Sequence, residues 1–263
     1  MFYQIQKYSE PLFPDIIWSK PEQKAQSGKL LILGGNLHAI AAPSESYAIA
    51  IKTGIGEVKV AMPDKTKKLL GSKIPSDIML TTSNPSGSFS NKGLDEIKNY
   101  MVWADATLFA GDFGRNSETA ILLENLAKIS SSNQIYTRDA VDYFLYNPHV
   151  LIERSNTLIV VSLSQLQRIL ISLKWPKAIK YDMGLDNLCN LLKALTKEYP
   201  AIIIVQYYSN IISAYEGSVI VTKLITEPKI WRLKTATTCS VWWLQNKSKP
   251  LESIVTAITQ INW

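Results

Sequence analysis

Two aspartates that follow short apolar runs are the acidic side chains best placed to take part in chemistry. Asp112 comes shortly after the run 106–109, and Asp139 follows the run 135–136. In a parallel α/β sheet the carboxyl ends of such strands meet at one edge, where these folds bind their ligands. Either carboxylate could transfer a proton or contact a ligand there, and either could instead cap a turn.

A glycine pair is a second candidate, because its backbone amides could approach an anionic ligand. Gly34–Gly35 follows the apolar run 29–33, and small residues lead from it to a predicted helix near Pro43. Two adjacent glycines allow turns that bring backbone N–H groups close to a phosphate. Most such turns are only turns, so this pair needs the support of neighbouring motifs.

Several other chemistries are excluded by the residue types present. Cys189, Cys239, His38 and His149 form no Cys-x-x-Cys, His-Glu-x-x-His or paired-histidine spacing, so we expect no metal site. The chain has no Gly-x-Ser-x-Gly motif, which argues against a serine hydrolase. The cysteines are expected to be free thiols, and His38 is expected to be an exposed turn residue.

The elements that must position these residues alternate between short apolar runs and longer amphipathic stretches. Runs such as 30–33, 157–160 and 201–205 lack polar alternation, which is typical of strands buried on both faces of a parallel sheet. The predicted strands are residues 29–33, 57–62, 78–81, 106–109, 135–136, 157–161, 202–207 and 219–222. The predicted helices are residues 43–53, 94–101, 117–130, 164–173, 185–199 and 240 to the end. This order predicts a three-layer α/β sandwich with a central, mostly parallel sheet flanked by helices, as a single domain over residues 1–263.

The composition limits the classes of partner. The 263 residues are 46% hydrophobic and 19% charged, with a formal net charge of +6. The lysines are scattered along the chain rather than clustered, which disfavours nucleic-acid binding. No apolar run approaches the roughly 20 residues that span a bilayer, and Glu10 and Asp15 interrupt the region where a signal peptide would need an apolar run. We therefore expect a cytoplasmic protein without membrane contacts.

The order of three motifs in segment 29–63 resembles that of a known family. Gly34–Gly35, Ala41–Ala42–Pro43 and Gly54–Ile55–Gly56 stand where the ADP/ATP-dependent NAD(P)H-hydrate dehydratases have a Gly-Gly turn, a Gly-Ala-Pro stretch and a Gly-x-Gly turn. Ala41 replaces one of the family's glycines. These enzymes are a branch of the ribokinase-like superfamily, so the resemblance implies the ribokinase-like fold.

Two later motifs extend this resemblance to segments that contact the substrate in the family. Segment 110–115 resembles the family's Gly-Pro-Gly-Leu-Gly-Arg loop, and segment 137–141 resembles its Asp-Ala-Asp-Ala-Leu strand end, of which only Asp139 is kept. Ser162 stands at the position of the family's substrate-binding histidine, and Gln165 at that of a glutamate. The residues that the resemblance implies for substrate binding are Gly35, Asn36, Ala42, Asp112, Gly114, Asp139 and Ser162.

The motifs that bind the nucleotide in the family are the most altered. The family's Leu-Lys-Gly becomes residues 205–207, and its Ala-Thr-x-Gly-Ser-Gly-Asp-x-Leu loop becomes residues 236–244, where Trp242 replaces the catalytic aspartate. The resemblance implies that this segment keeps its strand, loop and helix start, whose amides hold an anion. The residues implied for nucleotide or anion binding are Gln206, Asn210, Thr237, Ser240, Val241 and Trp242, with ADP or ATP and Mg²⁺ as the ligands.

The loss of the aspartate favours a protein without the family's reaction, because an indole transfers no proton near neutral pH. We expect Trp242 and Tyr207 to fill the former nucleotide pocket. The favoured hypothesis is a divergent NAD(P)H-hydrate dehydratase-like protein that lacks catalytic activity, binds a small molecule or serves in assembly, and forms a homo-oligomer as its relatives do. The alternatives are an active ADP/ATP-dependent dehydratase with relocated residues, and a small-molecule kinase of the same superfamily.

Overall fold

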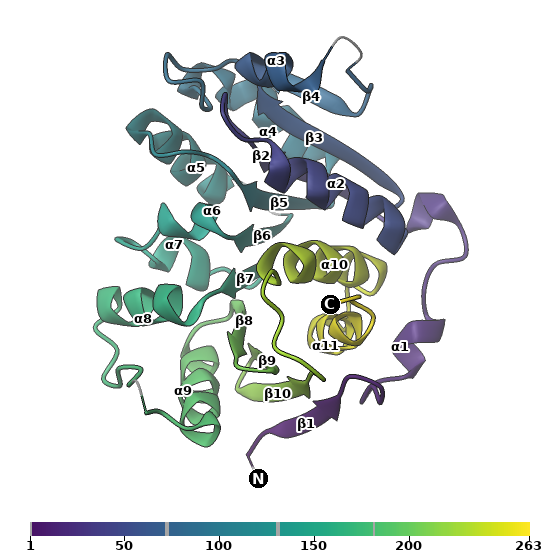
Figure 1. Ribbon diagram of the computed structural model, residues 1–263, viewed down its shortest axis with the longest axis vertical. Helices are drawn as coiled ribbons and strands as arrows, with labels where there is room; N and C mark the ends of the chain where they lie inside the picture. Colours follow the sequence, from purple (N-terminus) through teal and green to yellow (C-terminus); the bar gives the residue numbers. More distant parts are fainter. Residues whose placement is uncertain (1, 72–73, 130–131, 181) are drawn as a thin grey trace.

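One mixed sheet organises the molecule in the computed structural model, which describes residues 2–71, 74–129, 132–180 and 182–263 (Figure 1). Its ten strands follow the order β1-β10-β9-β8-β7-β6-β5-β2-β3-β4. Their bounds are β1 Gln4–Lys7, β2 Lys29–Gly34, β3 Glu57–Pro63, β4 Ile78–Thr81, β5 Ala106–Gly111, β6 Asn133–Thr137, β7 Thr157–Val161, β8 Ile202–Tyr207, β9 Asn210–Tyr215 and β10 Ser218–Lys223. All neighbouring strands run parallel except β9, which is antiparallel to both β8 and β10. The predicted mostly parallel sheet is confirmed.

Two strands were missed by the sequence prediction, each for a physical reason. β1 is a four-residue edge strand in which only Gln6 is buried, so it lacks the apolar run that marks a core strand. β9 forms a hairpin with β8 through the short turn at Tyr208 and Ser209, and its apolar stretch Ile211–Ile212 is short. The turn lacks the Asn-Gly or Asp-Gly pair that announces a two-residue hairpin.

Helices cover both faces of the sheet (Figure 1). Their bounds are α1 Asp15–Trp18, α2 Ala41–Thr53, α3 Lys67–Leu70, α4 Leu94–Trp103, α5 Ser117–Ile129, α6 Asp139–Asp142, α7 His149–Ile152, α8 Leu163–Ser172, α9 Leu185–Glu198, α10 Arg232–Gln245 and α11 Pro250–Thr259. Helices α4 to α9 pack in one hydrophobic cluster, whereas α1, α2, α10 and α11 pack in a second cluster on the other side of the sheet. The predicted three-layer sandwich is confirmed.

The strands alternate their side chains between these two clusters, as a central strand covered on both faces must. In β2, Leu30 and Ile32 belong to the cluster of α2 and α10, while Leu31 and Leu33 belong to the other. The two cysteines are buried free thiols, one in each cluster, which confirms that they are unpaired. Among the described residues, no helix is both long and apolar enough to span a bilayer.

The C-terminal region corrects the sequence prediction of a single helix from Ser240 to the end. Helix α10 already begins at Arg232, and α11 begins at Pro250 after a break at 246–249. Proline at the first position of α11 suits a helix start, because its missing N–H would have no partner there. One predicted helix end, Ser130, lies outside the described residues.

Candidate functional site at the carboxyl edge of the sheet

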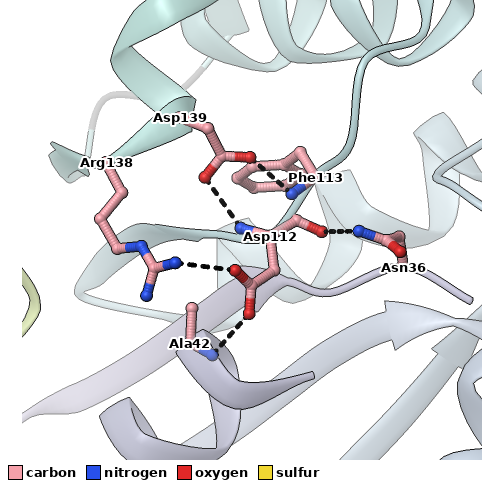
Figure 2. Close-up of polar contacts among 6 residues, drawn as sticks. All are labelled: Asn36, Ala42, Asp112, Phe113, Arg138 and Asp139. Carbon is pink, nitrogen blue, oxygen red and sulfur yellow. Dashed lines mark hydrogen bonds and ion pairs between the residues drawn. The ribbon is translucent and has the colours of Figure 1, made fainter. Parts of the chain in front are cut away.

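The Asp112 carboxylate lies where three elements meet at the carboxyl edge of the sheet (Figure 2). Its Oδ2 accepts a hydrogen bond from the Ala42 backbone N–H at 2.7 Å, in the first turn of α2. Its Oδ1 accepts one from the Arg138 guanidinium at 2.9 Å. A negative charge suits the positive end of a helix, so the chain supplies its own anion at the start of α2. Both carboxylate oxygens are therefore engaged.

The Asp139 carboxylate holds the loop that carries Asp112. Its two oxygens accept hydrogen bonds from the backbone N–H groups of Asp112, at 2.8 Å, and Phe113, at 2.9 Å. Burial raises the pKa of the Asp139 carboxyl above its ordinary value, although these two backbone donors favour the ionised form. Asp139 therefore holds the loop 110–115 in place through its backbone, which is the capping role that the sequence left open.

Asn36 ties the glycine turn of β2 to the same loop. Its side-chain amide donates a hydrogen bond to the Asp112 carbonyl at 2.6 Å, and its side-chain oxygen accepts one from the His38 N–H at 2.8 Å. Gly35 precedes it with a φ of 92°, and the exposed ring of His38 confirms the expected turn residue. The hydroxyl of Tyr143 donates a hydrogen bond to the Gly114 carbonyl and so closes the other end of the loop.

Strained backbone is concentrated at this edge. Asp112, Arg138 and Tyr208 have φ values of 61°, 56° and 52°, although none is a glycine, and they follow β5, β6 and β8. Such conformations cost of order 1–3 kcal/mol each and cluster at ligand sites in proteins. Gly111, which ends β5 directly before Asp112, has a φ of 116°. A side chain is disfavoured there, because its Cβ would lie 2.6 Å from Asp139 Oδ1.

A second polar chain connects β6 and β7 to the start of α10. Gln165 donates from its amide nitrogen to the Arg138 carbonyl and to Asp142, both at 2.8 Å, and accepts from Arg232 at 2.9 Å. Ser162 and Gln165 form a capping box that begins α8. Burial, followed by the nearby Arg138 guanidinium, lowers the pKa of Arg232. Two guanidinium groups therefore face this edge, each with a partner from the chain.

A cleft of about 530 Å³ adjoins this network at the ends of β7 and β8. It is lined by Ser162, Leu163, Gln206, Glu227, Pro228, Lys229 and Trp231. The Gln206 amide donates to the Pro228 carbonyl at 3.3 Å and to the Tyr208 carbonyl at 3.0 Å, so it holds the loop that forms one wall. The volume suits a small organic molecule.

The structure brings together most of the predicted substrate-binding residues but disperses the predicted nucleotide-binding ones. Gly35, Asn36, Ala42, Asp112, Gly114 and Asp139 surround one loop, and Ser162 lies at the neighbouring strand end. Gln206 lines the cleft beside Ser162, and Asn210 donates from its side-chain amide to the Tyr207 carbonyl at 3.2 Å. The remaining four residues, Thr237, Ser240, Val241 and Trp242, all lie in the middle of α10.

The predicted loop at Thr237–Ser240 is wrong, because these residues are helical and buried. The Thr237 hydroxyl donates to the Ser46 hydroxyl at 3.2 Å, facing α2, and the Ser240 hydroxyl donates to the Ala236 carbonyl at 2.6 Å. Their backbone amides are used inside α10, whose first residue is Arg232. An amide in the interior of a helix has no N–H left for an anion.

The prediction that Trp242 and Tyr207 fill one pocket is also wrong. Trp242 is 1% exposed and belongs to the cluster of α2 and α10, whereas Tyr207 packs against the cluster on the other face of the sheet. Trp242 follows Arg232 by ten residues, which places it about 15 Å along the helix from the carboxyl edge. The indole is buried as expected, but in the helix layer and not at the site.

Three polar residues of this edge were not predicted as site residues. Arg138 and Gln165 connect the two networks, and Arg232 begins α10 beside them. The capping-box spacing of Ser162 and Gln165 was a sequence signal that could have identified Gln165. An isolated arginine before a helix gives no such signal. In the described part of the chain, no group of three His, Cys, Asp or Glu side chains is placed to hold a metal ion.

Comparison with known proteins places this architecture among solved structures. A ribokinase-like superfamily protein from Enterococcus faecalis superposes with a TM-score of 0.74 at 15% identity, covering 97% of this chain and 85% of that one. The fold is ribokinase-like. The ADP/ATP-dependent NAD(P)H-hydrate dehydratase from Bacillus subtilis, co-crystallised with ATP and Mg²⁺, shares this ribokinase-like fold with a TM-score of 0.60 at 11% identity, over 94% of this chain and 86% of that one.

Sequence similarity to the same group is limited to part of the chain. No protein-family model matches. Over 129 residues, or 48% of the chain, the sequence is 27% identical to the bifunctional NAD(P)H-hydrate repair enzyme Nnr of Dictyoglomus turgidum. The match covers 25% of that curated relative's length. The resemblance to the NAD(P)H-hydrate dehydratases that the motifs indicated is thereby confirmed for a ribokinase-like chain.

Proposed function

We propose that this chain is a ligand-binding protein on a ribokinase-like scaffold and does not carry out the nucleotide-dependent dehydration of the enzymes it resembles. The observation that carries the proposal is Trp242. It stands at the aspartate position of the family motif, is 1% exposed, and lies within α10 rather than at its start. Neither a proton-transferring side chain nor free helix-start amides are present where the family motif supplies both.

The carboxylates around the Asp112 loop also support this proposal. Asp112 and Asp139 each use both oxygens to accept hydrogen bonds within the chain, and Asp142 accepts one from Gln165. A general base needs an oxygen that can reach a substrate proton. An active dehydratase with relocated residues, or a small-molecule kinase, would therefore need the loop around Asp112 to rearrange.

ADP, ATP and Mg²⁺, which the family resemblance implies, do not fit the residues at the corresponding positions. The glycines that would let a phosphate approach are Cys239 and Val241, both fully buried inside α10. Gln206 replaces the lysine and is held by two backbone carbonyls. We therefore assign no reaction step to a nucleotide.

The ligand site of this proposal is the cleft beside Ser162 and Gln206. Lys229 and Glu227 bring one charge of each sign to it, and Trp231 contributes an aromatic wall. This combination of charged and aromatic side chains suits a small polar molecule that is bound but not converted. A cytoplasmic location, which the apolar patterning led us to expect, and self-association, which the resemblance implies, remain proposals. Light scattering of the purified protein would test self-association.

The decisive experiment follows NADH formation from NADH hydrate by the purified protein with ADP or ATP and Mg²⁺, beside the Bacillus subtilis dehydratase as positive control. We expect no nucleotide-dependent conversion, since loss of general acid–base assistance alone typically lowers a rate about 10²–10⁴-fold. Robust conversion would contradict the proposal. Thermal-shift measurements with ADP, ATP, AMP, NADH and NADPH then test binding.

A pair of variants tests whether a ligand that raises the melting temperature binds in this cleft. Lys229→Gln removes a lysine that lines the cleft, and Lys223→Gln removes one at the end of β10 that is not among the lining residues. A ligand-induced shift that Lys229→Gln reduces and Lys223→Gln preserves supports the cleft as the site. Equal shifts in both variants would place the ligand elsewhere.

A further inference from the structure

A second groove lies in the helix layer that α2, α10 and α11 form on one face of the sheet. It encloses about 400 Å³ and is lined by residues of α2, of α10 and of the segments that follow α1 and α11. Helices α2, α10 and α11 lie side by side on this face (Figure 1). The residues that define this basic groove are Lys20, Lys52, Thr53, Lys234, Thr238 and Trp242.

The groove gathers positive charge from three separate parts of the chain. Lys20 follows α1, Lys52 lies in the last turn of α2, and Lys234 lies in the first turn of α10. No aspartate or glutamate is among the lining residues. Three ammonium groups without a carboxylate repel one another, and an anion placed among them would relieve that repulsion.

The floor of the groove orients two of these lysines. The Lys20 ammonium lies 4.0 Å from the centre of the Trp242 ring, within the range of a cation–π interaction. Lys234 donates to the Asn262 carbonyl at 3.3 Å. Lys52 has no hydrogen bond or ion pair to another described residue, so its three donors are available. Burial lowers the pKa of Lys20, as expected for an ammonium partly removed from water.

We propose that the basic groove binds a small molecule that carries at least two negative charges, such as a phosphorylated metabolite. Lys52 would supply an uncommitted ammonium group, Lys20 one held on the indole, and Lys234 one held at the Asn262 carbonyl. Side chains of Thr238 and Ile49 add a hydroxyl and an apolar contact for the rest of the molecule. The volume limits the ligand to about the size of a mononucleotide.

Isothermal titration calorimetry with inorganic pyrophosphate tests this site directly. We expect saturable binding that weakens as salt is raised, because the contacts are between charges. Lys52→Gln and Lys20→Gln should each raise the dissociation constant about tenfold, which is the loss expected for one charge-assisted hydrogen bond. Lys68→Gln, which removes an exposed lysine from the distant helix α3, is the matched control and should leave the constant unchanged.

Further outcomes separate this site from the alternatives. Lys229→Gln should not affect pyrophosphate binding, so failure of the cleft proposed above leaves this test intact. The proposal is overturned if pyrophosphate does not bind, or if Lys68→Gln weakens binding as much as Lys52→Gln. It is also overturned if the lysine variants weaken only attachment to phosphatidylserine vesicles, which would make these lysines part of a lipid-binding surface. Circular dichroism and melting curves establish that each variant is folded.

Discussion

The Arg138 guanidinium lies 2.9 Å from the Asp112 carboxylate, and both residues have backbone conformations that side chains rarely adopt. Asp112 is 10% exposed and Arg138 35% exposed, so water screens the pair only partly. Because Asp112 also accepts a hydrogen bond from the first turn of α2, this pair holds the start of α2 and the strand ends of β5 and β6 together. The family resemblance had implied a substrate-binding role for Asp112, whereas in the structure both of its carboxylate oxygens accept hydrogen bonds from the chain.

Replacing the Asp112 carboxylate should destabilise the protein even though no catalytic role is assigned to it. Asp112→Asn keeps a residue that tolerates positive φ, and we expect it to lower the free energy of unfolding by about 1–3 kcal/mol through the lost charge. Asp112→Ala should cost about 1 kcal/mol more, because alanine is strained at a φ of 61°. Urea unfolding measures both.

The control for this comparison is Asp95→Asn. Asp95 is 92% exposed and pairs with Lys98 at 3.4 Å on the surface of α4. Exposed pairs contribute little, so the expected change is within about 0.5 kcal/mol. If Asp112→Asn were as mild as this control, the carboxylate would not hold the strand ends together.

Gly111→Ala should be among the most damaging small substitutions in this chain. The new methyl group would lie 2.6 Å from Asp139 Oδ1, at a φ of 116°. We expect a loss of about 2 kcal/mol or more in the free energy of unfolding. Gly184→Ala is the control, since nothing lies within 4 Å of its Cβ position and its φ is −68°; it should cost less than about 1 kcal/mol.

The two tryptophans Trp242 and Trp18 offer a matched test of burial. Trp242 is 1% exposed and Trp18 is 86% exposed. Trp242→Ala should lower the free energy of unfolding by about 3–5 kcal/mol, and Trp18→Ala by less than about 0.5 kcal/mol. Thermal and urea unfolding measure this difference, and similar values for the two variants would show that Trp242 is not a core residue.

Introducing the family's aspartate should not restore a reaction. Trp242→Asp places a carboxylate in an apolar layer about 15 Å along α10 from the carboxyl edge. Replacing the packed indole by a smaller, buried carboxylate is costly even with the Lys20 ammonium nearby, so we expect strong destabilisation instead of activity. Nucleotide-dependent conversion of NADH hydrate by this variant would show that α10 can adopt the family's loop.

The raised pKa of Asp139 gives a signed prediction for the pH dependence of stability. An acid whose pKa is higher in the folded protein binds its proton more tightly there. Its contribution to stability therefore falls as pH rises from the unfolded pKa, near 4, through the folded one. The difference in unfolding free energy between the parent protein and Asp139→Asn, which does not titrate, should shift in favour of the parent as pH is lowered through this window. A shift in the opposite direction would show that the two backbone donors outweigh burial.

The sequence by itself determined the layered fold. An unbroken apolar run can bury side chains on both faces of a strand only between two helical layers, so it predicts a central parallel strand. Such runs are residues 30–33, 157–160 and 202–205. The order of glycines around Gly34–Gly35 and Gly114 likewise located the turns at the strand ends. These signals are local or periodic, which is why they can be read without the structure.

Only the tertiary structure decided what the site residues do. Asp112 and Arg138 are 26 residues apart in the sequence. They meet because β5 and β6 are neighbours in the sheet, and because both residues have positive φ values that no sequence pattern predicts. The motif resemblance placed Trp242 in a nucleotide-binding loop. In the structure, the buried side chains along 233–244 favour a continuous helix, and α10 therefore begins at Arg232, before the predicted loop. A helix extends as far as its packing stabilises it, and α10 packs against α11, the next helix in the chain, and against α2, which is distant in sequence.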